Sequence, residues 1–204
     1  MRRTSSFDLV FPKIFHQAHS IANKCGLLPR YLNGVLKTAN SDSTRAAVAS
    51  LVQTYRAAAK EKPTTHSNII HIVHSVPDGT PIFTPKTPLA AEFDEIIPLE
   101  GEPVIAKHFP GSFTGTDLDA SLKLLVADGD KRGKKVVLAG YMAHVCVSMT
   151  ARQASELGYD VVIVGDAVGD RDIPGARGEE VTRMVLAELA DAVGTVVESK
   201  DIKA

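Results

Sequence analysis

The stretch "KKVVLAGYMAHVCVSMTARQASELG", residues 134–158, decides the fold. Its first part is a run of apolar residues that is typical of a buried parallel strand. Its second part predicts a helix, which Gly158 ends at the position where left-handed backbone is needed. The strand therefore ends, and the helix begins, close to Cys146. In parallel sheets covered by helices, ligands bind beyond the carboxyl ends of the strands, so Cys146 lies where a site is expected.

The same alternation of strand and helix extends along the chain. Short runs rich in β-branched and other apolar residues predict further strands at residues 68–75, 104–109, 160–168 and 194–199. Helical spacing and end signals predict helices at residues 41–62, 116–129 and 178–194. The pattern indicates an α/β fold, a three-layer, doubly wound and mostly parallel sheet with helices on both faces.

The expected organisation is one domain at residues 31–204, preceded by an atypical leader at residues 1–30. A chain of 204 residues is large enough for one sizeable core and short for two domains. The first strand of the sheet is doubtful, because "IANKCGLLPR" at residues 21–30 contains no apolar strand. A segment rich in Pro and Gly at residues 76–103 predicts a long surface loop. The loop contains two aromatic side chains, Phe83 and Phe93. They are interpreted either as one wall of a substrate pocket or as anchors that hold the loop to the body of the domain.

Composition and charge limit the classes of function that the chain can have. The formal net charge of −1 provides no field that would attract nucleic acid or an anionic membrane. No apolar run approaches the roughly 20 residues that span a bilayer. Two cysteines, Cys25 and Cys146, do not make a disulfide framework, so a reducing compartment is expected. We expect a cytoplasmic protein with a small-molecule substrate. Early arginines and few acids in the leader make mitochondrial targeting the alternative.

Two side chains are candidates for covalent chemistry. Near a helix N-terminus, the macrodipole and unpaired N–H groups favour a Cys146 thiolate, which is the nucleophilic form. The alternative is a buried cysteine that only fills space. Lys107 follows a mostly apolar run at a predicted strand end. In the same cleft it would favour the thiolate and stabilise an attacked oxygen, whereas otherwise it only marks the end of the strand.

The histidines and the other polar residues of the chain do not form a recognisable metal-binding motif. His71 and His74 are three apart on a predicted strand, so their side chains lie on opposite faces. The chain contains no H-E-x-x-H, C-x-x-C or D-x-H segment, and we predict neither metal nor cofactor. His144 is either a general base near Cys146 or a cap of the first helical turn. Asp170 is interpreted as closing a polar turn.

The motifs together resemble those of the isochorismatase-like cysteine hydrolases, which include isochorismatase, nicotinamidase and N-carbamoylsarcosine amidohydrolase. The resemblance rests on "VIAKHFPGSFTGTDLDASL" at residues 104–122 and "VVLAGYMAHVCVSMTARQASELGYDVVIVGDAV" at residues 136–168, in the order of the family. It extends over roughly residues 33–198 with the "GEEVTRMVLAELA" segment. The "GYMAHVCVSMTAR" form is similar to a subgroup without an assigned substrate.

The resemblance implies a doubly wound fold and an Asp–Lys–Cys triad. It assigns the nucleophile to Cys146 and the lysine to Lys107. It also implies a cis peptide bond between Tyr141 and Met142, with the backbone N–H groups of Met142 and Cys146 forming the oxyanion hole. Tyr141 and His144, together with Phe83, are predicted to line the substrate pocket.

The aspartate of the triad has no clear counterpart. In the family it ends the first strand, and counting back from Tyr31 places it near Gly26, which cannot transfer a proton. Asp8 is the nearest alternative, without the segment that follows the aspartate in the family. Three explanations stay open: a degenerate paralogue without turnover, Asp8 as the base, or a misassigned or alternatively spliced first exon.

The predicted function is that of a metal-independent cysteine hydrolase of a small amide or enol ether. The alternative is a catalytically impaired family member that lacks the general base and acts as a binding or interaction protein. A redox-responsive thiol protein is a third interpretation, although no resolving cysteine is evident. The family resemblance further implies a homo-oligomer, a dimer or a tetramer.

Overall fold

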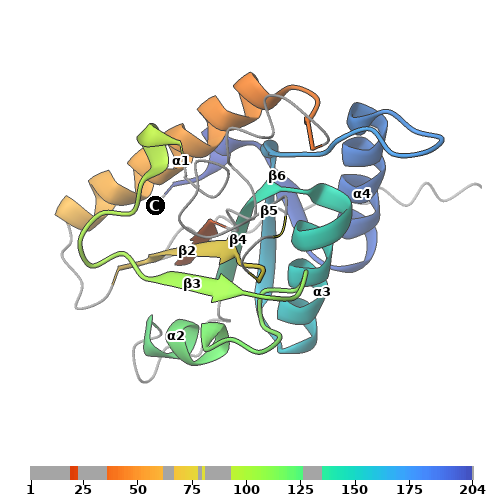
Figure 1. Ribbon diagram of the computed structural model, residues 1–204. Helices are drawn as coiled ribbons and strands as arrows, with labels where there is room; N and C mark the ends of the chain where they lie inside the picture. The colour runs from red at the N-terminus through yellow and green to blue at the C-terminus, as the bar shows by residue number, and fades with distance from the viewer. Residues whose placement is uncertain are drawn as a thin grey trace, which may run out of the picture.

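A parallel sheet forms the middle layer of the structure (Figure 1). The computed structural model describes residues 19–22, 36–61, 67–77, 80, 93–125 and 135–203. Within these ranges the sheet has six strands in the order β3-β2-β1-β4-β5-β6, all parallel. The strands are β1 (His19–Ala22), β2 (Ile69–His74), β3 (Val104–Lys107), β4 (Lys135–Tyr141), β5 (Asp160–Gly169) and β6 (Thr195–Val197).

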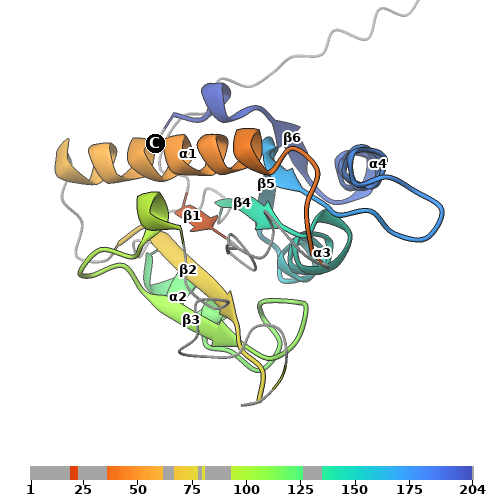
Figure 2. The ribbon, with the colours of Figure 1, turned by 45° about the horizontal axis from the view of Figure 1, so that its top comes forward.

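Helices cover both faces of this sheet, as predicted. Figures 1 and 2 show α1 (Ser41–Glu61) across one face, with α2 (Leu118–Leu125), α3 (Ser148–Glu156) and α4 (Gly178–Ala192) on the other side. Each face has its own core of buried side chains. Val48, Leu51 and Tyr55 of α1 pack on Val137 and Val162, whereas the second core joins α2, α3 and α4 to Val136, Leu138 and Ile163. The three-layer α/β architecture is confirmed.

The first strand, which the sequence left in doubt, is present as β1 in the middle of the sheet. Ser20 and Ile21 pair with Ile69 and Ile70 of β2, and β1 also pairs with residues 136–139 of β4. Its four residues, "HSIA", include two polar ones, so the strand carries no apolar run that would reveal it. Part of the segment interpreted as a leader therefore belongs to the sheet. The rest of residues 1–30 lies outside the described residues, and the boundary at residue 30 stays a prediction.

The strand β5 changes register against β4 near its carboxyl end. Leu138 pairs with Ile163, but Gly140 pairs with Val168, so β5 contains extra residues between these two pairs. Beyond this irregularity, a Cβ on Gly169 would lie 2.6 Å from the Cε1 atom of Tyr141. Glycine therefore permits the close approach of β5 to the end of β4. This approach brings the segment after β5 next to the segment after β4.

The described part of the long loop is anchored to α1. Phe93 is only 6% exposed and precedes the short 3-10 helix η3 (Asp94–Ile96). The guanidinium of Arg45 lies over its ring, 3.9 Å from the centroid, and Arg45 also forms an ion pair with Glu95. Of the two interpretations of the aromatic residues in this loop, Phe93 is therefore an anchor.

None of the helices in the described ranges is long and apolar enough to cross a membrane.

Candidate active site

Cys146 lies in a single π-helical turn, η4 (Ala143–Val147), between β4 and α3. The turn follows a cis peptide bond between Tyr141 and Met142, as the family resemblance implies. The carbonyl of Met142 accepts the N–H groups of Val145 and Val147, at 3.2 Å each. Cys146 is 7% exposed at the carboxyl edge of the sheet. π-Helical turns are rare and often occur at functional sites.

Lys107 ends β3, and its side chain is fully buried. Its Nζ donates a hydrogen bond to the carbonyl of Pro110, and its own carbonyl accepts the N–H of Ser75 after β2. A buried ammonium group needs such partners, because burial of an unpaired charge costs several kcal/mol. Lys107 is therefore a buried lysine at the end of β3, and its role beside Cys146 stays a prediction.

The loop after Lys107 is fastened to the helix that follows Cys146. Ser112 and Thr150 are both fully buried, and the Thr150 Oγ1 atom lies 3.1 Å from the N–H nitrogen and 2.9 Å from the Oγ atom of Ser112. Gln153 accepts the N–H of Phe113 at 3.2 Å and donates to Thr114 at 2.7 Å. Thr150 follows Cys146 by four residues and so lies on the same side of the helical segment. These bonds join the loop after Lys107 to the helix after Cys146, although β1 and β2 lie between β3 and β4.

His144 is held by a carboxylate that sequence reasoning placed in a turn. Asp170 directly follows β5, and its side chain is fully buried. Its Oδ2 atom lies 2.8 Å from the backbone nitrogen of His144 and 2.6 Å from the ring Nδ1 atom. The Oδ1 atom accepts the N–H of Arg171 at 2.8 Å, so part of the predicted turn is present. The two residues are 26 positions apart, and only the approach of β5 to β4 brings them into contact.

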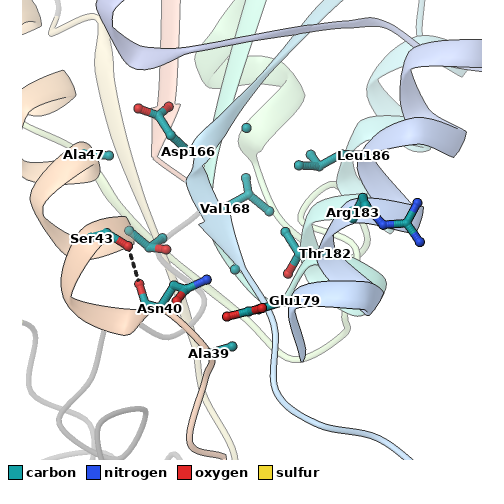
Figure 3. Close-up of a pocket in the computed structure, with 13 residues that line it drawn as sticks. Ala39, Asn40, Ser43, Ala47, Asp166, Val168, Glu179, Thr182, Arg183 and Leu186 are labelled. Carbon is teal, nitrogen blue, oxygen red and sulfur yellow. Dashed lines mark hydrogen bonds between the residues drawn. The ribbon is translucent and has the colours of Figure 1, made fainter. Parts of the chain in front are cut away.

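Asp166 does not contact His144 or Cys146 but binds the segment after β6. It accepts hydrogen bonds from the backbone N–H and the hydroxyl of Ser199, in the short 3-10 helix η5 (Ser199–Asp201). Asp166 also borders a groove of about 550 Å³ beside β5. Figure 3 shows side chains of α1 and α4 on either side of Val168, with Asp166 at one end and Glu179 at the other. None of Cys146, Lys107 and His144 lines this groove, so it is not the predicted site.

Three predicted site residues do not gain support from the structure. Tyr141 is fully buried in the core beneath α1, and its hydroxyl donates to the carbonyl of Ser41 at 3.2 Å. Burial raises the pKa of Tyr141 above its usual range. The structure thus places this side chain in the core instead of a substrate pocket. Phe83 and Asp8 lie outside the described residues.

In the described ranges, no group of three or more His, Cys, Asp or Glu side chains is placed to hold a metal ion. The expectation of metal-independent chemistry stays a prediction.

Comparison with known proteins identifies the family. The model of the isochorismatase domain matches residues 27–201, which is most of the chain. The chain belongs to the isochorismatase family. The fold agrees with this family, because an isochorismatase from Pseudomonas putida superimposes with a TM-score of 0.77 at 29% identity, covering 91% of this chain and 89% of that protein.

Two relatives differ in what their names say. The secreted isochorismatase effector Isc1 of Verticillium dahliae is 49% identical over 173 residues, which cover 84% of each chain. The maleamate amidohydrolase of Pseudomonas putida is 34% identical over 106 residues, 47% of each chain. The similarity to the secreted effector overturns the prediction that this protein is cytoplasmic. That prediction rested on the number of cysteines, and two cysteines are compatible with either compartment because secretion does not require a disulfide.

Proposed function

We propose that this isochorismatase-family hydrolase cleaves the C–N bond of a small amide through Cys146. The observation that supports this most directly is the position of Cys146 in a π-helical turn at the carboxyl edge of the sheet, with the segment of the buried Lys107 fastened to the following helix. The relative named a maleamate amidohydrolase supports an amide as substrate. An enol ether is the other substrate class, supported by the relatives named isochorismatases.

In the proposed reaction, the Cys146 thiolate attacks the amide carbonyl carbon and forms a C–S bond. The backbone N–H groups of Met142 and Cys146 and the Lys107 ammonium stabilise the oxyanion. The C–N bond then breaks, and the leaving amine takes up the proton that the thiol lost. Water attacks the resulting thioester, a C–O bond forms and the C–S bond breaks, which releases the carboxylic acid and restores the thiol.

The test is turnover of a panel that contains maleamate, isochorismate and simple primary amides. We expect Cys146→Ala to abolish turnover and Lys107→Met to lower it by about 100-fold or more, because each removes a group that acts on the reacting atoms. Cys25→Ser serves as the matched thiol control and should retain turnover. Undiminished turnover by Cys146→Ala would refute the proposal.

A second candidate function is that of a binding protein that has kept the fold without turnover. It is favoured by the residues that follow β1 in the sequence, Asn23, Lys24 and Cys25, which include no carboxylate. In the family, the aspartate of the triad ends the first strand. Binding of a panel compound that the protein does not convert, unaffected by Cys146→Ala, would support this function.

The relative named a secreted effector supports secretion of this chain as part of the same proposal. Assembly into a dimer or tetramer is also proposed, on the resemblance to the family alone.

A further inference from the structure

We propose that Gln153 is a positioning residue for Lys107. Its side-chain amide fixes the loop that carries the carbonyl of Pro110, and this carbonyl accepts a hydrogen bond from the Lys107 ammonium. The inference rests on the proposed function, in which the ammonium of Lys107 acts on the atoms that react at Cys146. Gln153 is assigned no contact with the substrate and acts through Lys107.

The first step is the dependence of the ammonium on the loop that directly follows it. Lys107 is fully buried, and its Nζ atom donates to the carbonyl of Pro110, three residues later. A buried ammonium group is held by its acceptors, because the burial of an unpaired charge is strongly unfavourable. A displacement of the Pro110 carbonyl would therefore displace the ammonium.

The second step is the contact of Gln153 with the peptide group that carries this carbonyl. That peptide group joins Pro110 to Gly111, and Gly111 has no side chain to keep the amide of Gln153 away. A Cβ on Gly111 would lie 2.6 Å from the Cδ atom and 2.7 Å from the Nε2 atom of Gln153, which is too close for a real side chain. Glycine at this position therefore lets the amide pack directly on the backbone next to the acceptor of Lys107.

The third step is the orientation of the Gln153 amide. Its Oε1 atom accepts the backbone N–H of Phe113 at 3.2 Å, and its Nε2 atom donates to the Thr114 hydroxyl at 2.7 Å. Both ends of the amide are thus bound to the loop, in addition to the packing on Gly111. Gln153 belongs to α3, which continues directly from the turn that contains Cys146. These contacts fix the loop relative to the helix that follows Cys146.

The loop has a second attachment to α3 that does not involve Gln153. Ser112 and Thr150 are fully buried and in hydrogen-bonding contact, whereas Gln153 is only half-buried. Replacement of Gln153 therefore leaves the buried attachment in place. This difference allows the positioning role to be tested in a folded protein.

The experiment measures the pH dependence of the reaction of Cys146 with iodoacetamide. Because the thiolate is the form that reacts, the pH at which the rate reaches half of its maximum reports how strongly the surroundings favour the thiolate. A general change in access to Cys146 alters the maximal rate but not this midpoint. The full-length protein is used, and mass spectrometry of the peptides distinguishes Cys146 from Cys25.

We expect Lys107→Met to raise the midpoint by about one pH unit or more, because it removes a positive charge that favours the thiolate. Gln153→Met keeps the length of the side chain but removes both hydrogen bonds to the loop, and it should raise the midpoint by about half a pH unit. In a chain that already carries Lys107→Met, Gln153→Met should cause no further shift. Gln53→Met is the matched control, since Gln53 is exposed in α1, and it should keep the wild-type midpoint.

The outcomes separate this inference from the proposed function. A wild-type midpoint in Gln153→Met, or a shift that persists in the Lys107→Met background, would overturn the role of Gln153 and leave the proposed function intact. An unchanged midpoint in Lys107→Met would refute the use of Lys107 in the proposed function, and the inference with it. The ionisable pair at the cysteine turn, His144 and Asp170, is the same in every variant and so cannot cause a difference between them.

A second pair of variants keeps the inference testable if Lys107→Met does not fold. The Cβ of Gly111→Ala would displace the amide of Gln153, and Gly111 does not have the left-handed backbone that would strain an alanine. Gly111→Ala should therefore raise the midpoint as Gln153→Met does. The double variant should show the shift of one single variant, since both changes remove the same contact, and a sum of the two shifts would overturn the inference.

Discussion

Glu102 shows how one carboxylate holds a loop against two elements of the fold. Its oxygens accept both the Nε and Nη2 groups of Arg56 in α1, at 2.8 Å each, and the backbone N–H of Leu99 at 2.9 Å. The Nε2 atom of His71, a fully buried residue of β2, lies 2.7 Å from the carboxylate. Burial by itself raises the pKa of Glu102. The hydrogen bonds from Arg56, Leu99 and His71 outweigh it and lower the pKa to about 2.

The pH dependence of stability follows from this lowered pKa. A carboxylate with a lowered pKa in the folded state stabilises the protein above its unfolded pKa, near 4.5, and this contribution is lost as the pH falls towards 2. Glu102→Gln should therefore lower the free energy of unfolding by roughly 2 kcal/mol at pH 7. The difference from wild type should shrink by about half or more between pH 5 and pH 3. Urea unfolding at several pH values measures both effects.

Glu100→Gln is the matched control for this measurement, since Glu100 is an exposed carboxylate two residues away. Its free energy of unfolding should follow that of wild type at every pH. A Glu102→Gln difference that is constant with pH would contradict the assignment of the stabilisation to the ionised carboxylate.

At the scale of elements, the contact between the loop after β3 and α3 connects stability with the site. Thr150→Val keeps the shape of the side chain but removes the oxygen that lies within hydrogen-bonding distance of the N–H and the hydroxyl of the buried Ser112. A buried N–H without an acceptor costs about 1–3 kcal/mol, so the free energy of unfolding should fall by that amount. Because this loop follows Lys107, the reaction of Cys146 with methyl methanethiolsulfonate should also slow.

Thr182→Val is the control for the exchange of a hydroxyl for a methyl group in a helix. The Thr182 hydroxyl donates only to the carbonyl of Gly178 within α4, at 2.8 Å, and this carbonyl is four residues earlier. Its loss should cost less than about 1 kcal/mol and leave the reactivity of Cys146 unchanged. An equal cost in both variants would contradict the role of Thr150 in fastening the loop.

Most helices and strands could be predicted from the sequence because their signals are local. The apolar run of β4 and the glycine after α3, Gly158 with φ of 80°, mark their elements without reference to the rest of the chain. The strand β1 is different, since residues such as Ser20 adopt the strand through pairing on both sides. Its signal lies in its neighbours, not in its own composition.

At the scale of the whole molecule, the candidate site was predictable only in part. The positions of Cys146 and Lys107 follow from the ends of β4 and β3. The contact of His144 with Asp170 depends on the register shift between β4 and β5, which no local pattern in either segment records. The burial of Tyr141 beneath α1 likewise depends on how Gly169 lets β5 approach.

The position of β1 makes the whole sheet depend on four residues. β2 and β3 lie on one side of β1, and β4, β5 and β6 lie on the other. The N–H groups of a central strand all take part in the ladders to its neighbours. Ile21→Pro should therefore break the connection between the two halves of the sheet and cost about 3 kcal/mol or more.

Thr195→Pro provides the comparison, since Thr195 is the first residue of the edge strand β6, where proline is better tolerated. Urea unfolding should show a much larger loss of stability for Ile21→Pro, together with slower reaction of Cys146 with methyl methanethiolsulfonate, because β4 presents the cysteine turn at the edge of the joined sheet. If Ile21→Pro were as stable and as reactive as Thr195→Pro, β1 would not be the strand that joins the two halves. The site would then be built on β4, β5 and β6 alone, and the segment of Lys107 would have to be held in place by its bonds to α3.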